Sequence, residues 1–407
     1  MSRLSRHCRR PSAHAITISV AAAACDPPAG EGKREASAEQ DSAVILRDSA
    51  DIQIVENVTP KWDSAEFWSV EPEPEFTIGG YGGTSDPRNA SHLVWDIVAA
   101  AVLSDGRVVM LSPNGENKVL IFEPSGALSA SFGRQGDGPG EFQYPHDLQV
   151  LGDTIAVWEG MFGAVSYFDA SGTLLRERHI DVGAVISATR TTDRYPSESM
   201  RQPLPDGSFI VTIRLRGWER PRAGELYREP VGYVRVDTTY AAHALGWWEG
   251  LEEVSPHDPS IPFLPFPAAS IIAGGGHPLS IYLTNGDSYE LHRFSTEGVL
   301  QRIIRRELDP SPVTSEDVDR WKEHFVLSNP LYNSPNPLVD RRDWEQAMAA
   351  VPSRFHPPIN KMHVDSEGYL WVQDGGGQDT TAQWTVFDPG GRWLGTLEIP
   401  VEKVLWD

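Results

Sequence analysis

The feature that most constrains this chain is a pair of glycine turns that recurs at nearly constant spacing. In four copies the two turns lie 20 or 22 residues apart, at Gly106 and Gly126, Gly152 and Gly172, Gly276 and Gly298, and Gly368 and Gly390. On either side of each turn, apolar and polar residues alternate, which is the pattern of a strand with one buried face. Glycine also permits the backbone conformation that tight hairpins need. Each copy therefore predicts four short antiparallel strands.

The four-strand unit occurs five times along the chain. The paired segments are 99–111 with 117–133, 146–158 with 163–180, 202–214 with 232–248, 271–284 with 289–304, and 360–373 with 382–399. Units of four strands repeated about every 40–50 residues are typical of a β-propeller, in which neighbouring sheets bury each other's faces. We therefore predict an all-β propeller. The alternative is one β-sandwich or two, a fold that does not require the same two turns five times over.

Two segments before the first copy, 51–57 and 66–80, read as strands without an inner hairpin of their own. Because the ends of a closed propeller usually share a blade, we predict that they are the outer strands of a sixth blade. After the fifth copy only residues 400–407 remain, so Val404–Trp406 either begins an inner strand or the chain is truncated. The sixth blade is therefore predicted to be incomplete, with exposed strand edges.

One junction between copies carries a resemblance to a known family. FGRQGDGPGEFQYPHDLQV (132–150), followed by FDASG (168–172), resembles the NHL-type repeat of six-bladed propellers, with its Gly-Pro-Gly-Glu-Phe-x-x-Pro junction. The whole of 44–407 is similar to bacterial exported six-bladed propellers that begin with a strand like DSADIQIVEN (48–57). The resemblance implies six blades in one propeller domain, 44–407, and it implies no particular activity.

The first 24 residues have the layout of an export signal. Four arginines precede a short apolar run from Ile16 to Ala24, which is too short to span a hydrocarbon core roughly 30 Å thick. Small residues lead directly to Cys25, and this exit resembles a bacterial lipoprotein signal. The resemblance implies lipidation of Cys25 and a membrane-anchored protein on the periplasmic or cell-surface side. The alternative is an ordinary secretory signal cleaved nearby. Residues 25–43, rich in Pro, Gly and small polar residues, predict a flexible tether.

Composition excludes two classes of function. The formal net charge of −22 argues against nucleic-acid binding, because phosphate contacts need a basic face. Two cysteines cannot form a disulfide scaffold or a four-thiolate zinc site.

The lengths of the connections separate two ends of the predicted blades. In a four-strand meander, the first and third turns lie at one end, and all of these are short. The long connections lie at the other end: 134–145, 217–230, 249–267 and 306–357. The insertion 306–357 predicts helices over 315–325 and 342–351, which either form a lid or pack as an appendage. Because loops carry function on a rigid scaffold, we expect binding at the long-loop end.

Candidate ligand-binding residues gather near these connections. They are Trp95, His146, Arg214, Arg216, Trp218, Arg220 and Tyr227. The arginines of GWERPRAGELYREP (217–230) could hold an anionic group, or they could form ion pairs with the glutamates beside them. Both interpretations remain open.

A second set of residues suggests a metal. Glu159, Asn285 and Asp374 follow second strands, and oxygen ligands converging on one axis could bind a divalent cation such as Ca²⁺. Sugar-lactone hydrolases of similar six-bladed form have such an arrangement, and there a metal-activated water would attack a lactone or ester. The alternative is that these side chains line a water-filled channel, with no cofactor.

Three functions therefore stay open. The favoured one is a lipid-anchored extracytoplasmic scaffold, without enzymatic activity, that binds a small molecule, a glycan or a protein at its long-loop end. The second is a metal-dependent lactone or ester hydrolase. The third is an assembly or structural protein of the cell envelope. Fold alone cannot choose among them, because propellers host many functions.

Overall fold

The computed structural model describes residues 43–62, 68–69, 78, 97–113, 118–159, 163–181, 183–184, 196–215, 221–222, 225–254, 264–328, 354–376 and 381–400. The chain divides into two compact units. The first is built around residues 70–181, and the second combines 29–69 with 182–401. Each unit has its own buried apolar clusters.

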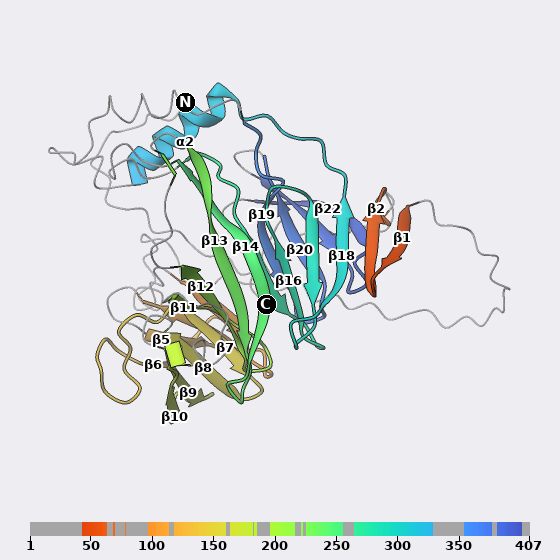
Figure 1. The fold of residues 1–407 in the computed structure, drawn as a ribbon. Coiled ribbons are helices and arrows are strands. Elements are labelled where there is room, and N and C mark those ends of the chain that lie inside the picture. Colours follow the sequence, from red (N-terminus) through yellow and green to blue (C-terminus); the bar gives the residue numbers. More distant parts are fainter. Residues whose placement is uncertain are drawn as a thin grey trace. The chain divides into compact units, whose positions relative to one another are not determined.

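Within the described ranges, five antiparallel four-stranded meanders form the blades (Figure 1). The first unit holds two of them: β3 (Ala99–Val102), β4 (Val108–Ser112), β5 (Lys118–Phe122) and β6 (Leu128–Phe132); and β7 (Asp147–Leu151), β8 (Thr154–Glu159), β9 (Ala164–Asp169) and β10 (Leu174–His179). The second unit holds three: β11 (Pro196–Pro203), β12 (Phe209–Leu215), β13 (Leu226–Val236) and β14 (Ala242–Val254); β15 (Ile271–Gly275), β16 (Ser280–Thr284), β17 (Glu290–Phe294) and β18 (Leu300–Arg306); and β19 (Ile359–Val364), β20 (Leu370–Asp374), β21 (Thr381–Phe387) and β22 (Trp393–Pro400). The all-β propeller fold is confirmed.

The short turns share a local mechanism that explains their recurrence in the sequence. At the β9–β10 turn, Asp169 Oδ1 accepts the backbone N–H groups of Ser171 (2.8 Å) and Thr173 (2.9 Å), and Gly172 has φ +86°. The same aspartate arrangement recurs at Asp237, Asp365 and Asp388. In the last turn the left-handed residue is Gly391, one position after the predicted Gly390. An aspartate side chain and a residue in the left-handed conformation, which is glycine in three of these turns and Tyr240 in the Asp237 turn, therefore fix these hairpins locally.

The junction that resembles the NHL repeat lies between the two blades of the first unit. Phe142 is fully buried among residues of both blades and lies 5.8 Å from Phe168, ring centroid to ring centroid. The loop closes on itself, because Phe142 N donates to Arg134 O (2.8 Å) and Glu141 accepts both Gly138 N (2.9 Å) and Arg134 Nε (2.6 Å). The motif therefore holds an aromatic wedge between neighbouring sheets.

The three blades of the second unit pack against one another in chain order. Leu204, Ile210 and Tyr233 of one blade meet Ile281 and Leu283 of the next in a shared cluster. A second cluster joins that middle blade to β19–β22. At this seam the backbones approach closely, because a Cβ on Gly275 would overlap the carbonyl oxygen of Val364. The triple glycine 274–276 therefore serves blade packing.

The N-terminal strands differ from the expectation of a separate sixth blade. β1 (Val44–Ser49) pairs with β2 (Ile52–Asn57), and β2 pairs in parallel with β18 over Gln53–Asn57 and Arg302–Arg306. Together they extend β15–β18 into a six-stranded sheet, because the outer edge of β18 offers a free hydrogen-bonding ladder. Most of the predicted strand 66–80 and all of 401–407 lie outside the described residues. The structure therefore does not test whether these segments complete a sixth blade.

The chain between β18 and β19 contains α2 (Ser315–Ser328), as the sequence predicts for 315–325. The second predicted helix, 342–351, lies outside the described residues. Among the residues that the structure describes, no helix is both long and apolar enough to cross a membrane.

Candidate functional site

The blades of the second unit point the same way, so their long connections leave from one end. Here β12, β14, β16, β18 and β20 finish, and we call this the long-loop end. Contacts between neighbouring blades support this alignment: Arg228 on β13 reaches the β16–β17 turn at this end. At the opposite end, Gly276 approaches Gly368, and Arg235 donates to Thr296 O (3.0 Å). In Figure 1, the beginning of β13, the end of β14 and helix α2 lie toward the long-loop end.

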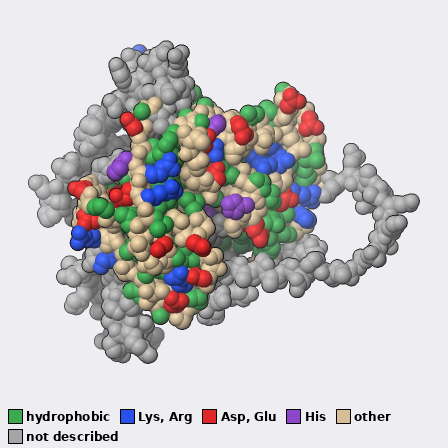
Figure 2. Space-filling model, turned by 90° about the horizontal axis from the view of Figure 1, so that it is seen from below, with side chains coloured by type: hydrophobic (Ala, Val, Ile, Leu, Met, Phe, Trp, Pro, Cys, Tyr) green, Lys and Arg blue, Asp and Glu red, His purple; other side chains and the backbone are tan. Residues whose placement is uncertain are grey.

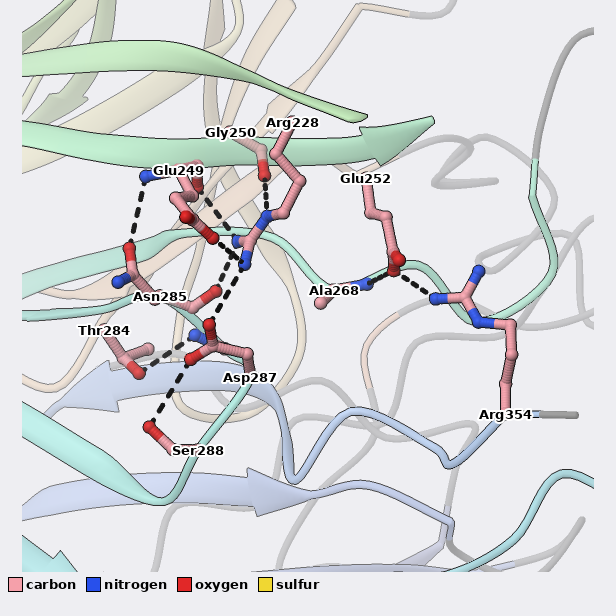
Figure 3. Close-up of polar contacts among 11 residues, drawn as sticks. Arg228, Glu249, Gly250, Glu252, Ala268, Thr284, Asn285, Asp287, Ser288 and Arg354 are labelled. Atoms are coloured by element: carbon pink, nitrogen blue, oxygen red, sulfur yellow. Dashed lines mark hydrogen bonds and ion pairs between the residues drawn. The ribbon is translucent and has the colours of Figure 1, made fainter. Parts of the chain in front are cut away.

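Arg228 is the centre of the polar network at the long-loop end (Figure 3). Its Nε donates to Gly250 O (2.8 Å), and its Nη2 donates to Glu249 O (3.0 Å) and Asn285 O (2.5 Å). Nη1 pairs with the carboxylates of Glu249 (2.9 Å) and Asp287 (3.4 Å). The side chain is only 12% exposed. Arg228 therefore joins β13, β14 and the next blade, which favours the ion-paired interpretation at this position.

A second ion pair joins the crossing segments to β14. Arg354, at the end of the long insertion, pairs with the Glu252 carboxylate, which also accepts Ala268 N (3.3 Å) from the β14–β15 connection (Figure 3). Beside it, the rings of Phe266 and His356 lie 4.5 Å apart. Because Glu252 and Arg354 are both largely buried, the pair fixes two long connections to one strand.

The insertion has a closed stem. Val313 N donates to Arg354 O (2.8 Å), and His356 N donates to Ser311 O (2.8 Å). Above the stem, α2 begins with a capping box in which Asp317 accepts Thr314 N (2.8 Å) and Thr314 Oγ1 accepts Asp317 N (3.2 Å). Partial desolvation works against the charge of Asp317, but hydrogen bonds from Thr314 and His356 outweigh it and lower its pKa to about 2.

Around this fixed framework, several side chains remain exposed. Phe355 is 59% exposed and Leu226 41%, and the Glu249 and Asp287 side chains are 57% and 49% exposed. Arg214, at the end of β12, is exposed, and its side chain forms no ion pair or hydrogen bond with the described residues. The long-loop end therefore offers apolar groups and both signs of charge. Acidic and basic side chains are likewise interspersed over the face seen in Figure 2.

The predicted ligand-binding residues have different places. Tyr227 lies at the long-loop end, where its hydroxyl donates to Glu253 Oε2 (2.7 Å). Arg214 lies at the same end, on β12. His146 belongs to the first unit, just before β7, where its N–H donates to Trp158 O (3.0 Å). Trp95, Arg216, Trp218, Arg220 and Cys25 lie outside the described residues.

Of the metal-ligand candidates, Asp374 has the most complete set of partners. It is buried, and its carboxylate accepts Tyr289 Oη (2.8 Å), Arg306 Nη1 (2.8 Å) and Thr385 Oγ1 (2.9 Å). Arg306 in turn lies 4.3 Å from the ring centroid of Trp393. Burial and the neighbouring carboxylate raise the pKa of Tyr289 well above its usual value. Both oxygens of Asp374 are thus used within a buried ion pair between two blades.

The other two candidates also use their oxygens within the chain. Glu159 Oε1 accepts the N–H groups of Gln143 (2.6 Å) and Tyr144 (2.9 Å), and Asn285 Oδ1 accepts Glu249 N (3.2 Å). Glu159 belongs to the first unit, whereas Asn285 and Asp374 belong to the second. Within the described parts of the chain, no three His, Cys, Asp or Glu side chains are grouped to hold a metal ion.

Several residues of the site were not among the sequence candidates. Glu252, Arg354 and His356 hold the insertion to β14 and α2, and nothing local in the sequence identifies the first two. The capping box at Thr314 and Asp317 is visible in the sequence, and it could have indicated that a charged group would lie at this helix start.

Comparison with known proteins agrees with the fold. Residues 93–196 match the family DUF5128, described as a six-bladed β-propeller; this match spans less than half of the chain. The described residues form five blades, so the sixth rests on that description. No curated protein matches the chain at a significant level.

Solved structures with a similar arrangement are distant. A "Putative exported protein" from Bacteroides fragilis is 15% identical with a TM-score of 0.37, over 77% of this chain and 73% of that one. A member of the DUF4221 family from Bacteroides vulgatus is 8% identical with a TM-score of 0.40, over 74% and 81%. A gluconolactonase from Xanthomonas campestris is 15% identical with a TM-score of 0.35, over 75% of each. Matches at this level carry no functional argument.

Proposed function

We propose that this protein is an exported, lipid-anchored scaffold that binds a partner at the long-loop end of its second unit. The partner is a small molecule, a glycan or a protein of the cell envelope. The layout of residues 1–25 supports export and lipidation of Cys25.

One observation carries the binding proposal: the long connections are fixed, while side chains suited to contact are left exposed between them. Arg228 locks two strands to the next blade, and the Glu252–Arg354 pair locks the insertion stem to β14. Phe355, Leu226 and Arg214 project from this framework. A surface ordered before binding loses less conformational entropy on association. This combination favours a recognition surface over loops that merely connect strands.

The hydrolase alternative has less support. The carboxylate of Asp374 is neutralised by Arg306, and Glu159 Oε1 is occupied by two backbone N–H groups. A metal at these residues would have to displace such donors. Metal analysis and assays with aliphatic lactones, for the wild type and Glu159→Gln, test this alternative directly. Stoichiometric Ca²⁺ with turnover that Glu159→Gln abolishes would replace the scaffold proposal.

A site-specific crosslinking experiment tests the binding surface. A photoreactive amino acid replaces Phe355 or Leu226 in the full-length protein. The variant is expressed in the bacterium from which the protein comes, and intact cells are irradiated. We expect one or more adducts of defined mass at these two positions, identified by mass spectrometry as protein, glycan or small molecule.

The matched control is Glu297, an exposed residue in the short β17–β18 turn at the opposite end of the same unit. The probe at this position should give no adduct. Equal labelling at Glu297, or no adduct from either long-loop position, would reject the proposal.

A further inference from the structure

A row of polar side chains crosses the middle blade of the second unit, away from the long-loop end. Tyr282 on β16 lies opposite Arg293 on β17, Arg293 lies opposite Arg302 on β18, and Arg302 lies opposite Gln53 on β2. Because directly paired residues share one face of a sheet, all four side chains face the same way. Tyr282 packs in the cluster shared with β19–β22, so this face looks toward that blade.

The two arginines meet the β21–β22 turn of the facing blade. Arg302 Nη1 donates to Pro389 O (3.0 Å), and Arg293 Nη1 approaches the same oxygen (3.5 Å). Arg302 Nε donates to Gln53 Oε1 (2.7 Å), and Arg293 Nη2 donates to Ser280 Oγ (3.0 Å). All of these acceptors are uncharged. Pro389 itself is exposed, so the guanidinium groups converge at the surface.

The charges of this pair lack ion-pair partners. Neither Arg293 nor Arg302 has a carboxylate within ion-pairing distance among the described residues. Asp388 interacts electrostatically with both Tyr282 and Arg302, and its Oδ1 already caps the turn by accepting Arg392 N (2.9 Å). Burial and the charge of Arg293 lower the pKa of Arg302. Arg305, on the other face of β18, pairs instead with Glu290 and Glu56.

Donors also remain unused. Arg293 Nε is buried and forms no hydrogen bond with the described residues. Arg302 Nη2 has no hydrogen bond to the described residues either. In a chain whose net charge is −22, two adjacent arginines facing neutral oxygens are an unusual local excess of positive charge. Guanidinium groups bind planar or tetrahedral oxyanions through two parallel N–H groups.

We propose that Arg293 and Arg302 form a binding site for a small oxyanion, a carboxylate or a phosphate group, at the seam between β15–β18 and β19–β22. The anion takes the free N–H groups of the two guanidinium groups and supplies the missing negative charge beside Pro389. The site is separate from the long-loop end, because Arg293, Arg302 and Pro389 lie beside the short turns 295–299 and 388–392. This proposal is independent of the proposed function.

Thermal unfolding and isothermal titration of the purified full chain test the site, with inorganic phosphate as one probe and acetate or succinate as the other. Ionic strength is held constant with chloride. We expect the wild type to show a saturable rise in Tm with one of the probes, because a ligand that binds the folded state stabilises it. Comparing the two probes shows whether the site prefers phosphate or carboxylate.

Arg302→Gln and Arg293→Gln should each weaken the binding of that probe by at least about tenfold. Arg302→Lys keeps the charge but loses the planar fork, and it should show an intermediate effect. Arg305→Gln is the matched control on the same strand and should bind like the wild type. If Arg302→Gln fails to fold, Arg302→Lys and Arg293→Gln still decide the question. No saturable response in the wild type, or an equal response in the wild type and both arginine variants, would overturn the proposal.

Discussion

At the residue scale, arginines of this chain have distinct roles that their sequence context does not distinguish. The Arg228 side chain is buried and donates to carbonyl and carboxylate oxygens. The Arg214 side chain is exposed and makes no such contacts with the described residues. Among those residues, Arg302 donates only to uncharged oxygens. The acceptors of Arg228 lie more than 20 residues away along the chain. The charge pattern of 217–230 therefore indicates a basic loop, but it does not show which arginine forms structural ion pairs and which stays available for a ligand.

The prediction at this scale is that Asp147 makes the stability of the fold depend on pH. Asp147 begins β7 opposite the buried Trp158, and burial raises its pKa to about 7, against an opposing hydrogen bond from Leu148 N. The unfolded chain ionises near the ordinary value of 3.8, so between about pH 4 and 7 only the folded state retains this proton. Stability is therefore expected to fall as pH rises through this window, and the cost is complete above about pH 7.

Asp147→Asn should remove this cost while keeping an acceptor for Leu148 N. We expect the free energy of unfolding of the variant, relative to the wild type, to increase by about 2–4 kcal/mol from pH 4 to pH 8. Urea denaturation at several pH values measures it. Asp153→Asn, in the exposed β7–β8 turn, is the control and should follow the wild-type profile. A constant difference between Asp147→Asn and the wild type at all pH values would contradict the prediction.

At the element scale, the accuracy of the sequence prediction follows the range of the interactions. The hairpins at Asp169, Asp365 and Asp388 were predictable because an aspartate and a glycine within five residues determine each of these turns. Helix α2 was predictable from its capping box and apolar spacing. The pairing of β2 with β18 was not, because the partners lie about 250 residues apart and the free edge of β18 exists only in the folded blade. The ion pairs of the candidate site belong to the same long-range class.

Gly275 provides the element-scale prediction. It lies at the end of β15, and a Cβ there would overlap the backbone carbonyl of Val364 on β19. Since backbone at a blade seam cannot move aside as a side chain can, Gly275→Ala should lower the free energy of unfolding by about 2 kcal/mol or more. Chemical denaturation measures this loss.

Gly152→Ala separates crowding from backbone strain. Gly152 has φ +62°, but a Cβ at this position would meet nothing within 4 Å, so alanine there adds only conformational strain of about 1 kcal/mol. If Gly275→Ala cost no more than Gly152→Ala, close approach of the blades would not be the reason for glycine at 275.

At the scale of the whole molecule, the two proposed sites and the proposed anchor are separate features. The oxyanion site lies beside short turns, and the binding surface lies at the long-loop end of the same unit. The proposed tether, 25–43, precedes β1, which extends the outer edge of the middle blade. A flexible tether lets a rigid scaffold meet partners in several orientations while it stays at the membrane surface. The proposed lipidation of Cys25 would therefore determine where either site acts.

The last prediction concerns Cys25. If this thiol is acylated, the full-length protein expressed in a bacterial host should enter the detergent phase in Triton X-114 partitioning and incorporate an alkyne-labelled fatty acid. Cys25→Ser should lose the label and move to the aqueous phase, because it lacks the thiol that would carry the acyl chain. Cys8→Ser removes the other cysteine and should behave like the wild type, since residue 8 lies within the predicted signal. A wild-type protein that stays unlabelled in the aqueous phase would instead favour a cleaved secretory signal and an unanchored scaffold, leaving both binding proposals to stand on their own tests.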